Sequence, residues 1–139
     1  MKMISRCEKD TFALAADVAK TLRAGDVILL HGELGAGKTT FTKGLAKALG
    51  IEETVTSPTF NYVKEYQGGR LPLFHFDMYR VSDADEVYEL GLEEYFYRGG
   101  VVVVEWNKFD GIERPIEVSI RSLGGDVREI EIDDKRIDG

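Results

Sequence analysis

The stretch His31-Gly32-Glu33-Leu34-Gly35-Ala36-Gly37-Lys38-Thr39-Thr40 is the part of this chain that most strongly determines its fold. It matches the pattern G-x-x-x-x-G-K-[ST], a glycine-rich loop in which several backbone N–H groups point inward at one anion. The pattern places an ammonium group at Lys38 and a hydroxyl at Thr39, suited to the outer phosphates and to a magnesium ion respectively. We therefore predict a nucleoside triphosphate site. Its predicted phosphate-contacting residues are Glu33, Leu34, Gly35, Ala36, Gly37, Lys38, Thr39 and Thr40.

The segments on both sides of the loop have the pattern that this motif requires. Residues 26–31 are apolar and β-branched, as in a buried parallel strand, and residues 38–49 have a helical pattern that ends at Gly50. The helix would direct the positive end of its dipole at the same anion. A turn that only joined a strand to a helix would have no need of lysine followed by threonine. The order of strand, loop and helix favours the P-loop NTPase fold, a three-layer α/β class with a mostly parallel central sheet.

Two further strands are expected to bring carboxylates to this loop. Four valines in succession precede Glu105, and such a run suits a central parallel strand covered on both faces. A carboxylate at the end of that strand is suited to the magnesium hydration shell. Residues 71–77 end in Asp77, which either ligates magnesium or orients the attacking water, or is simply a turn residue. Trp106 either packs beside the nucleotide or fills the rim of the sheet.

The remaining segments predict helices and antiparallel strands around this centre. Alternating residues indicate an antiparallel C-terminal extension with one wet face, followed by a frayed tail over residues 133–139. His75 is expected to make a structural hydrogen bond. The other expected elements are an amphipathic helix over 8–22 with Asp10 as N-cap, a hairpin of 61–66 and 71–77, a helix through Leu90 opened by a capping box from Ser82 to Asp85, a helical turn over 92–97 and a hairpin of 116–121 and 127–132.

The loop over residues 51–60 is polar and rich in hydroxyl groups. Pro58 gives it an extended shape, because proline restricts both its own φ and the conformation of the residue before it. Loops in this position of nucleotide hydrolases often carry hydroxyls to the terminal phosphate. The candidates are Thr54, Thr56, Ser57 and Thr59.

Composition predicts one globular domain over residues 1–139, a length sufficient for a single hydrophobic core. The single cysteine, Cys7, excludes an internal disulfide and fits a reducing, cytoplasmic setting. No apolar run approaches the roughly 18 residues of a membrane span. The net charge of −7 would repel free nucleic acid over most of the surface, so any nucleic-acid role is expected to be local or shared with a basic partner.

A second motif, Asn107-Lys108-Phe109-Asp110, leaves a small GTPase open as an alternative. It matches N-K-x-D, by which many GTPases read guanine. Against this interpretation, Asp77-Met78-Tyr79-Arg80 has arginine where the D-x-x-G element of a GTPase has glycine. A small-molecule kinase is another alternative, although no arginine cluster follows Glu105 to form its lid. A nucleotide-gated binding module with negligible turnover is a third.

Four motifs, taken together and in this order, closely resemble the bacterial TsaE (YjeE) family. They are G-E-L-G-A-G-K-T-T over 32–40, S-P-T-F over 57–60, H-F-D-M-Y-R over 75–80 and V-E-W over 104–106. The resemblance implies an ATPase that works with the TsaB and TsaD proteins to place threonylcarbamoyl on the adenosine beside the anticodon of certain tRNAs. It also implies contact with tRNA only through those partners, which agrees with the acidic charge.

The same resemblance implies a role for each site residue. Lys38 and the loop amides hold the phosphates of ATP, Thr39 and Glu105 hold Mg²⁺, Asp77 assists hydrolysis and Trp106 lies near the nucleotide. The expected catalytic residues are Lys38, Asp77 and Glu105. For the adenine side, the candidates are the segment 5–11 and the turn at Gly124-Gly125.

Overall fold

One mixed β-sheet organises the protein. The computed structural model describes residues 1–33, 35–56, 58 and 62–137, and its strands follow the order β1-β7-β6-β2-β5-β4-β3 across the sheet. The strands are β1 (Lys2–Ser5), β2 (Val27–His31), β3 (Val63–Tyr66), β4 (Leu73–Asp77), β5 (Val101–Glu105), β6 (Ile116–Gly124) and β7 (Val127–Asp134). The helices are α1 (Glu8–Ala19), α2 (Lys38–Ala48), α3 (Ala84–Glu89) and the 3-10 helix η1 (Leu92–Tyr97).

The centre of the sheet is parallel, as predicted. Strand β5 runs parallel to β2 on one side and to β4 on the other, and β2 also pairs in parallel with β6. Strands β3, β7 and β1 are antiparallel to their neighbours. The predicted C-terminal hairpin is therefore attached through β6, which itself belongs to the parallel part. Because β2, β4 and β5 run in one direction, their carboxyl ends meet at one edge, where Asp77 lies opposite Glu105.

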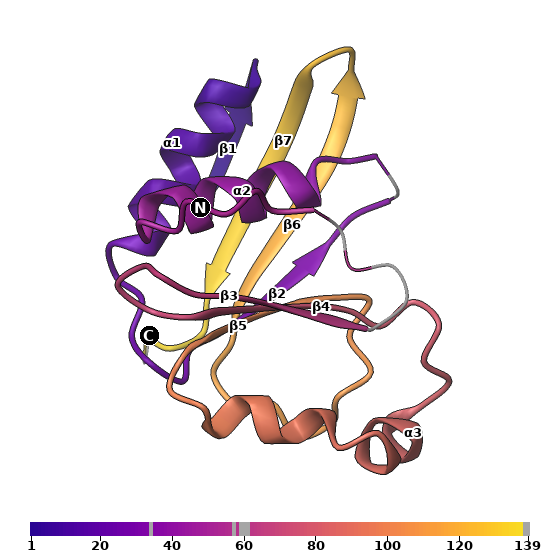
Figure 1. Ribbon diagram of the computed structural model, residues 1–139. Coiled ribbons are helices and arrows are strands. Elements are labelled where there is room, and N and C mark those ends of the chain that lie inside the picture. The colour runs from indigo at the N-terminus through magenta and orange to yellow at the C-terminus, as the bar shows by residue number, and fades with distance from the viewer. Residues whose placement is uncertain (34, 57, 59–61, 138–139) are drawn as a thin grey trace.

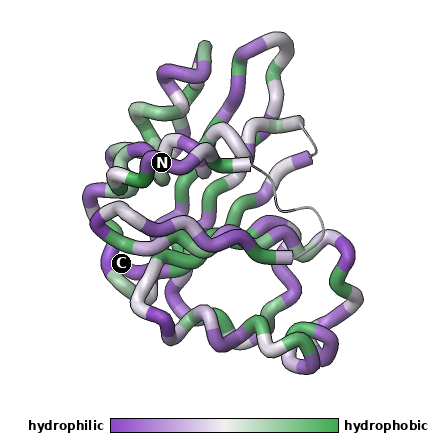
Figure 2. The backbone as a smooth tube through the Cα atoms, in the orientation of Figure 1, coloured by the Kyte–Doolittle hydropathy of each residue, from purple (hydrophilic) through white to green (hydrophobic). Residues whose placement is uncertain are grey.

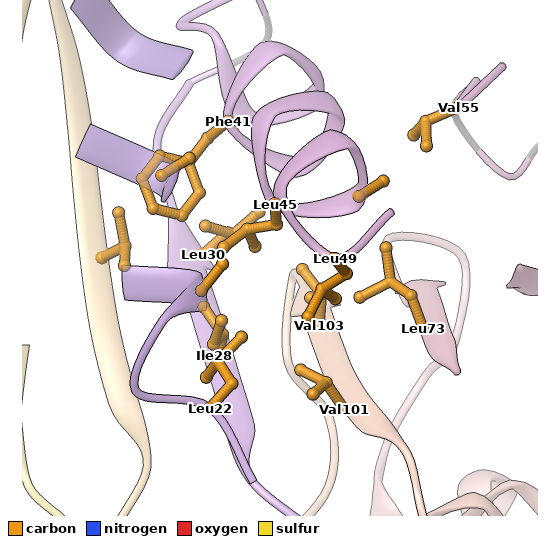
Figure 3. Close-up of a cluster of buried hydrophobic side chains, with 14 of the residues drawn as sticks. Leu22, Ile28, Leu30, Phe41, Leu45, Leu49, Val55, Leu73, Val101 and Val103 are labelled. Atoms are coloured by element: carbon orange, nitrogen blue, oxygen red, sulfur yellow. The ribbon is translucent and has the colours of Figure 1, made fainter. Parts of the chain in front are cut away.

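Helices cover both faces of this sheet, which gives the three layers visible in Figure 1. Helices α1 and α2 pack on one face, and α3 and η1 pack on the other. Hydrophobic residues gather on the central strands between these layers (Figure 2). In Figure 3, Leu45 of α2 and Leu49, the residue that caps its C-terminal end, lie over Leu30 of β2 and Val103 of β5. Alternation along β5 therefore puts Val101, Val103 and Glu105 on the α2 side.

The structure corrects several local predictions. The N-cap of α1 is Cys7, and Asp10 instead accepts a hydrogen bond from the backbone N–H of Arg6 at 3.0 Å. Helix α1 ends at Ala19, three residues earlier than expected. The cap of α3 is Asp83, which accepts from the N–H of Glu86 at 3.0 Å, so the capping box is shifted by one residue.

Strand β1 was absent from the prediction. Its four residues are too few for a reliable periodic pattern. All four pair with residues of β7, at the edge of the sheet. None of the helices in the described ranges is both long and apolar enough to cross a membrane.

The C-terminal segment up to residue 137 is tied to the body of the protein, contrary to the frayed tail that we expected. Arg136 donates to Asp26 at 2.7 Å, to the carbonyl of Thr21 at 3.1 Å and to Asp134 at 2.7 Å. These hydrogen bonds from Arg136 hold the pKa of Asp134 below its ordinary value of 3.8. A sequence pattern does not reveal the contacts with Thr21 and Asp26, because these partners lie more than a hundred residues away along the chain.

We expect Arg136→Ala to lower the free energy of unfolding by about 1–3 kcal/mol, because it leaves partly buried acceptors without their donor. The pKa of Asp134 is lower in the folded than in the unfolded state. The stability that Asp134 adds to the folded state is therefore fully present above its unfolded pKa. It is lost as the pH falls through the lower pKa of the folded state. The difference between variant and wild type should then shrink below about pH 4, as measured by urea denaturation. Arg121→Ala, which removes an exposed ion pair with Glu129, is the control and should cost less than about 1 kcal/mol.

Candidate active site

The glycine-rich loop lies between β2 and α2, at the carboxyl edge of the parallel strands. Gly32 passes so close to β6 that a Cβ there would lie 2.6 Å from the carbonyl oxygen of Ile120, which excludes any larger residue. Gly37 is the N-cap of α2 with φ of 112°, a left-handed conformation that favours glycine. The first helical hydrogen bond runs from the N–H of Phe41 to the carbonyl of Gly37 at 3.0 Å. The amides of residues 38–40 therefore form the positive N-terminal end of the helix.

A cavity of about 620 Å³ opens at this helix end and brings together most of the predicted site residues. The predicted residues that line it are Gly35, Gly37, Lys38, Thr39, Thr40, Asp77, Glu105 and Trp106. Tyr62, Tyr79, Arg80 and Arg128 complete much of its wall. The sequence motifs at 32–40, 75–80 and 104–106 thus converge in space, as expected.

Two of the predicted loop contacts, Glu33 and Ala36, do not line this cavity. Glu33 and Ala36 line an adjoining cavity of about 710 Å³, which shares Lys38 and Trp106 with the first. The N–H of Ala36 donates to the carbonyl of Glu33 at 3.0 Å, so that amide is used within the loop. Leu34 lies outside the described residues, as do the hydroxyl candidates Ser57 and Thr59.

Glu105 is the buried centre of the site. Its residue exposure is 6%, and its carboxylate is shared between two neighbours. His75 on β4 lies 2.5 Å from one oxygen through Nε2, and Lys38 on α2 lies 3.7 Å from the other through Nζ. Because a carboxylate only accepts hydrogen bonds, Nε2 carries the proton and donates. The structural hydrogen bond expected for His75 is thus confirmed, and its acceptor is a predicted catalytic residue.

Trp106 forms the next layer of the site. The Lys38 ammonium lies 4.1 Å from the centre of the indole ring, and Tyr79 packs edge-to-face against the same ring at 5.3 Å. Trp106 has a φ of 55°, which is uncommon for a bulky residue and is found more often at functional sites than elsewhere. The indole therefore limits the positions open to the Lys38 side chain.

Asp77 makes the turn contact that its position allows, and it also lies at the cavity. Its carboxylate accepts a hydrogen bond from the backbone N–H of Tyr79 at 3.0 Å, which is a turn contact. It also lines the cavity of Lys38 and Glu105. Since a carboxylate has about four acceptor sites, the turn contact leaves capacity for a further ligand.

The oxygen ligands around the cavity fit a magnesium ion that is bound together with phosphates. Thr39 offers a hydroxyl, and Glu105 and Asp77 offer carboxylates on the same wall. In the described ranges no three His, Cys, Asp or Glu side chains form a complete metal cage. Magnesium is usually held by one or two carboxylates together with substrate phosphates and water, so a partial set suits it.

The N-K-F-D segment is occupied by structural contacts. Asn107 accepts from the N–H of Phe109 at 2.9 Å, Lys108 donates to the carbonyl of Val81 at 3.1 Å, and Asp110 accepts from the Tyr88 hydroxyl at 2.9 Å. The segment follows β5, the same strand that ends in Glu105. Each polar group of the motif therefore stabilises the loop between β5 and β6.

Arg128 is a site residue that the sequence analysis missed. It lies on β7 and lines the cavity beside Gly35 and Gly37. Its guanidinium donates to the carbonyl of Ala36 at 2.7 Å. Local pattern carries no signal for this contact, because ninety-two residues separate the two partners along the chain.

The fold and the site define a class: an α/β protein whose glycine-rich loop opens a helix at the carboxyl edge of a mostly parallel sheet. Comparison with known proteins identifies the family within this class. Residues 5–134 match the family model of "Threonylcarbamoyl adenosine biosynthesis protein TsaE", and the chain belongs to this TsaE family.

Individual relatives agree with this membership. The tRNA threonylcarbamoyladenosine biosynthesis protein TsaE of Bacillus subtilis is 48% identical over 125 residues, which cover 88% of this chain and 78% of the relative. The protein of the same name from Treponema pallidum is 41% identical over 135 residues, covering 95% and 99%. The crystal structure of Bacillus subtilis YdiB matches with a TM-score of 0.78 at 39% identity, covering 95% of this chain and 83% of that one.

The two histidines of the chain allow a direct test of the buried cluster. His75→Ala should lower the free energy of unfolding by about 2–4 kcal/mol, because it leaves the buried Glu105 carboxylate without its donor. His31 pairs with Glu117 at 3.1 Å in a much more exposed position, and His31→Ala should cost less than about 1 kcal/mol. Urea denaturation of both variants measures the difference. Equal losses would mean that Glu105 does not depend on His75.

Proposed function

We propose that this protein is a magnesium-dependent ATPase that acts with the TsaB and TsaD proteins in the formation of threonylcarbamoyladenosine on tRNA. One P-loop NTPase domain over residues 1–139 would perform this function. The observation that carries the enzymatic part is the single cavity in which Lys38, Thr39 and Glu105 meet at the start of α2. The pathway follows from family membership, because the relatives are named for that modification.

Catalysis in this proposal is mainly electrostatic. Lys38 and the amides at the start of α2 would neutralise the charge that spreads over the terminal phosphate as it passes from ADP to water. Thr39 and Glu105 would hold Mg²⁺, which supplies further positive charge to the phosphate oxygens when bound. Asp77, at the end of the neighbouring strand, would orient the attacking water. His75 would keep the Glu105 carboxylate in one orientation through its 2.5 Å hydrogen bond.

The adenosine would extend from the other side of the loop. A small cavity there is lined by Cys7, Glu8, Thr11, Gly37, Thr40, Ile120, Asp126 and Arg128. It includes residues of the N-terminal candidate segment 5–11, and Asp126, which directly follows the candidate turn Gly124-Gly125. Thr40 and Gly37 line this cavity and the larger one, so a nucleotide would run from one to the other along the loop.

The partners would provide the contact with tRNA. The chain has 25 acidic and 18 basic residues, a balance that disfavours direct binding of a polyanion. ATP hydrolysis would drive or reset a complex of TsaB and TsaD that binds the tRNA, and this reaction would take place in the cytoplasm.

A small-molecule kinase remains the second candidate, since it too would pair a phosphate loop with strand-end acids. Screening nucleosides and other hydroxyl acceptors for ATP-dependent phosphorylation separates the two.

We expect Lys38→Ala and Glu105→Gln to remain folded and to lose ATP hydrolysis by about 100-fold or more, because each removes a group that acts on the transition state. Lys38→Ala should also weaken ATP binding, whereas Glu105→Gln should retain most of it. Removal of magnesium with EDTA should abolish turnover in the wild type, and added Mg²⁺ should restore it. Turnover is followed as phosphate release, with and without TsaB and TsaD. Wild-type rates in Glu105→Gln would remove that residue from the mechanism.

The preference for ATP or GTP can be tested through Asp110. We expect the wild type to hydrolyse ATP in preference to GTP, and Asp110→Asn to leave that preference unchanged, because the Asp110 carboxylate is used by the Tyr88 hydroxyl. Competition between ATP and GTP in the same hydrolysis assay measures the preference. A GTP preference that is lost in Asp110→Asn would instead favour the guanine-binding interpretation of the N-K-F-D segment.

A further inference from the structure

We propose that Arg128 is a positioning residue that braces the phosphate loop from the β7 side and orients the amide of Gly37 toward the nucleotide. This inference rests on the proposed function, because it assigns the brace to a nucleotide-binding loop. Arg128 belongs to β7, on the far side of the C-terminal hairpin, and no motif of the sequence includes it.

The contacts of Arg128 join the loop to the turn of that hairpin. On the loop side, Nε donates to the carbonyl of Ala36 at 2.7 Å and Nη2 lies 3.5 Å from the carbonyl of Gly35. On the hairpin side, Nη1 donates to the carbonyls of Gly125 at 2.7 Å and Val127 at 3.0 Å. The rigid guanidinium fork is suited to holding several acceptors in fixed relative positions.

Because of peptide geometry, a hydrogen bond that holds the carbonyl of Ala36 also sets the direction of the N–H of Gly37. In a trans peptide the C=O and the following N–H lie in one plane and point in opposite directions. The carbonyl of Ala36 points at the Arg128 guanidinium, so the N–H of the same peptide unit, which belongs to Gly37, points away from it. Gly37 lines the main cavity and also the small cavity on the proposed adenine side. The brace therefore fixes the direction of one amide beside the region where the phosphates would lie.

The loop needs such a brace because Gly37 follows the peptide in question and a second glycine, Gly35, precedes Ala36. Gly35 has a φ of 79° and Gly37 a φ of 112°, and residues without a side chain oppose rotation of a peptide unit only weakly. Arg128 lies directly against this segment, since a Cβ on Gly37 would be 3.6 Å from its Nε. The guanidinium is always protonated and its acceptors here are neutral carbonyls, so its positive charge is also available to an anion in the adjoining cavities.

The experiment compares wild type, Arg128→Met and Arg128→Lys. Arg128→Met keeps the unbranched stem and removes every donor, and we expect it to weaken the binding of ADP and of ATP about equally, by roughly 10-fold. The KM for ATP should rise by a similar factor while kcat stays within about 2-fold, because the Gly37 amide contacts substrate and transition state alike. Arg128→Lys should recover part of the affinity, since an ammonium reaches one carbonyl but cannot fork between two.

A second measurement reports on the brace without any nucleotide. Amide hydrogen exchange of Gly37 should be about 10-fold faster in Arg128→Met than in the wild type and intermediate in Arg128→Lys. The matched control is Arg98→Met, which removes an exposed arginine whose partner is Glu65 at 3.0 Å and which lines neither cavity of the site. It should leave both affinity and exchange at wild-type values. If Arg128→Met does not fold, Arg128→Lys alone tests the brace. Reduced nucleotide affinity together with faster Gly37 amide exchange in that variant would support it, and wild-type values of both would overturn it.

The outcomes separate this inference from the proposed function. A wild type that binds neither ADP nor ATP overturns the proposed function. A wild type that binds both, with Arg128→Met at wild-type affinity, overturns only the role of Arg128. Weaker binding with unchanged Gly37 exchange would mean that Arg128 acts by charge alone, which also overturns the brace.

Discussion

The arrangement of the site depends on one buried carboxylate, that of Glu105. A carboxylate with so little access to water is unfavourable unless it is paired and hydrogen-bonded, and here the two partners come from two other elements of the fold. His75 belongs to the neighbouring strand β4, and Lys38 belongs to the first turn of α2. The need to satisfy this one group therefore ties strand β4, strand β5 and the start of the helix into a fixed relation.

The glycine-rich loop is held by contacts from two sides. On the inner side, Lys38 is positioned by Glu105 and by the ring of Trp106. On the β7 side, Arg128 holds the carbonyls of Ala36 and Gly35. The two contacts come from β5 and β7, strands that lie on opposite sides of β2 in the sheet. A loop rich in glycine has little conformational preference of its own, so its shape is set by these neighbours.

The N-K-F-D segment illustrates how a motif depends on its surroundings. Its residues satisfy the pattern letter by letter, yet their side chains bond to the backbone of Phe109 and Val81 and to Tyr88. It also follows β5, the strand that already contributes Glu105 to the cavity beside the glycine-rich loop. The glycine-rich loop is the opposite case, because the strand before it and the helix after it are the ones that its chemistry requires.

The sequence by itself determined the elements whose pattern is local and repeated. The apolar run of β2, the valines of β5 and the helical spacing of α2 were predictable because each depends on periodicity within about a dozen residues. The loop motif, Asp77 and Glu105 were found for the same reason, since they stand at the ends of such elements. Only the tertiary structure decided which groups meet across long stretches of chain. The pairing of β1 with β7, the anchoring of Arg136, the His75 donor to Glu105 and the Arg128 contact with the loop all join residues distant in sequence. Hydrogen bonds of this kind act over about 3 Å in space and leave no periodic trace along the chain, so they become visible only when the sheet has brought its strands together.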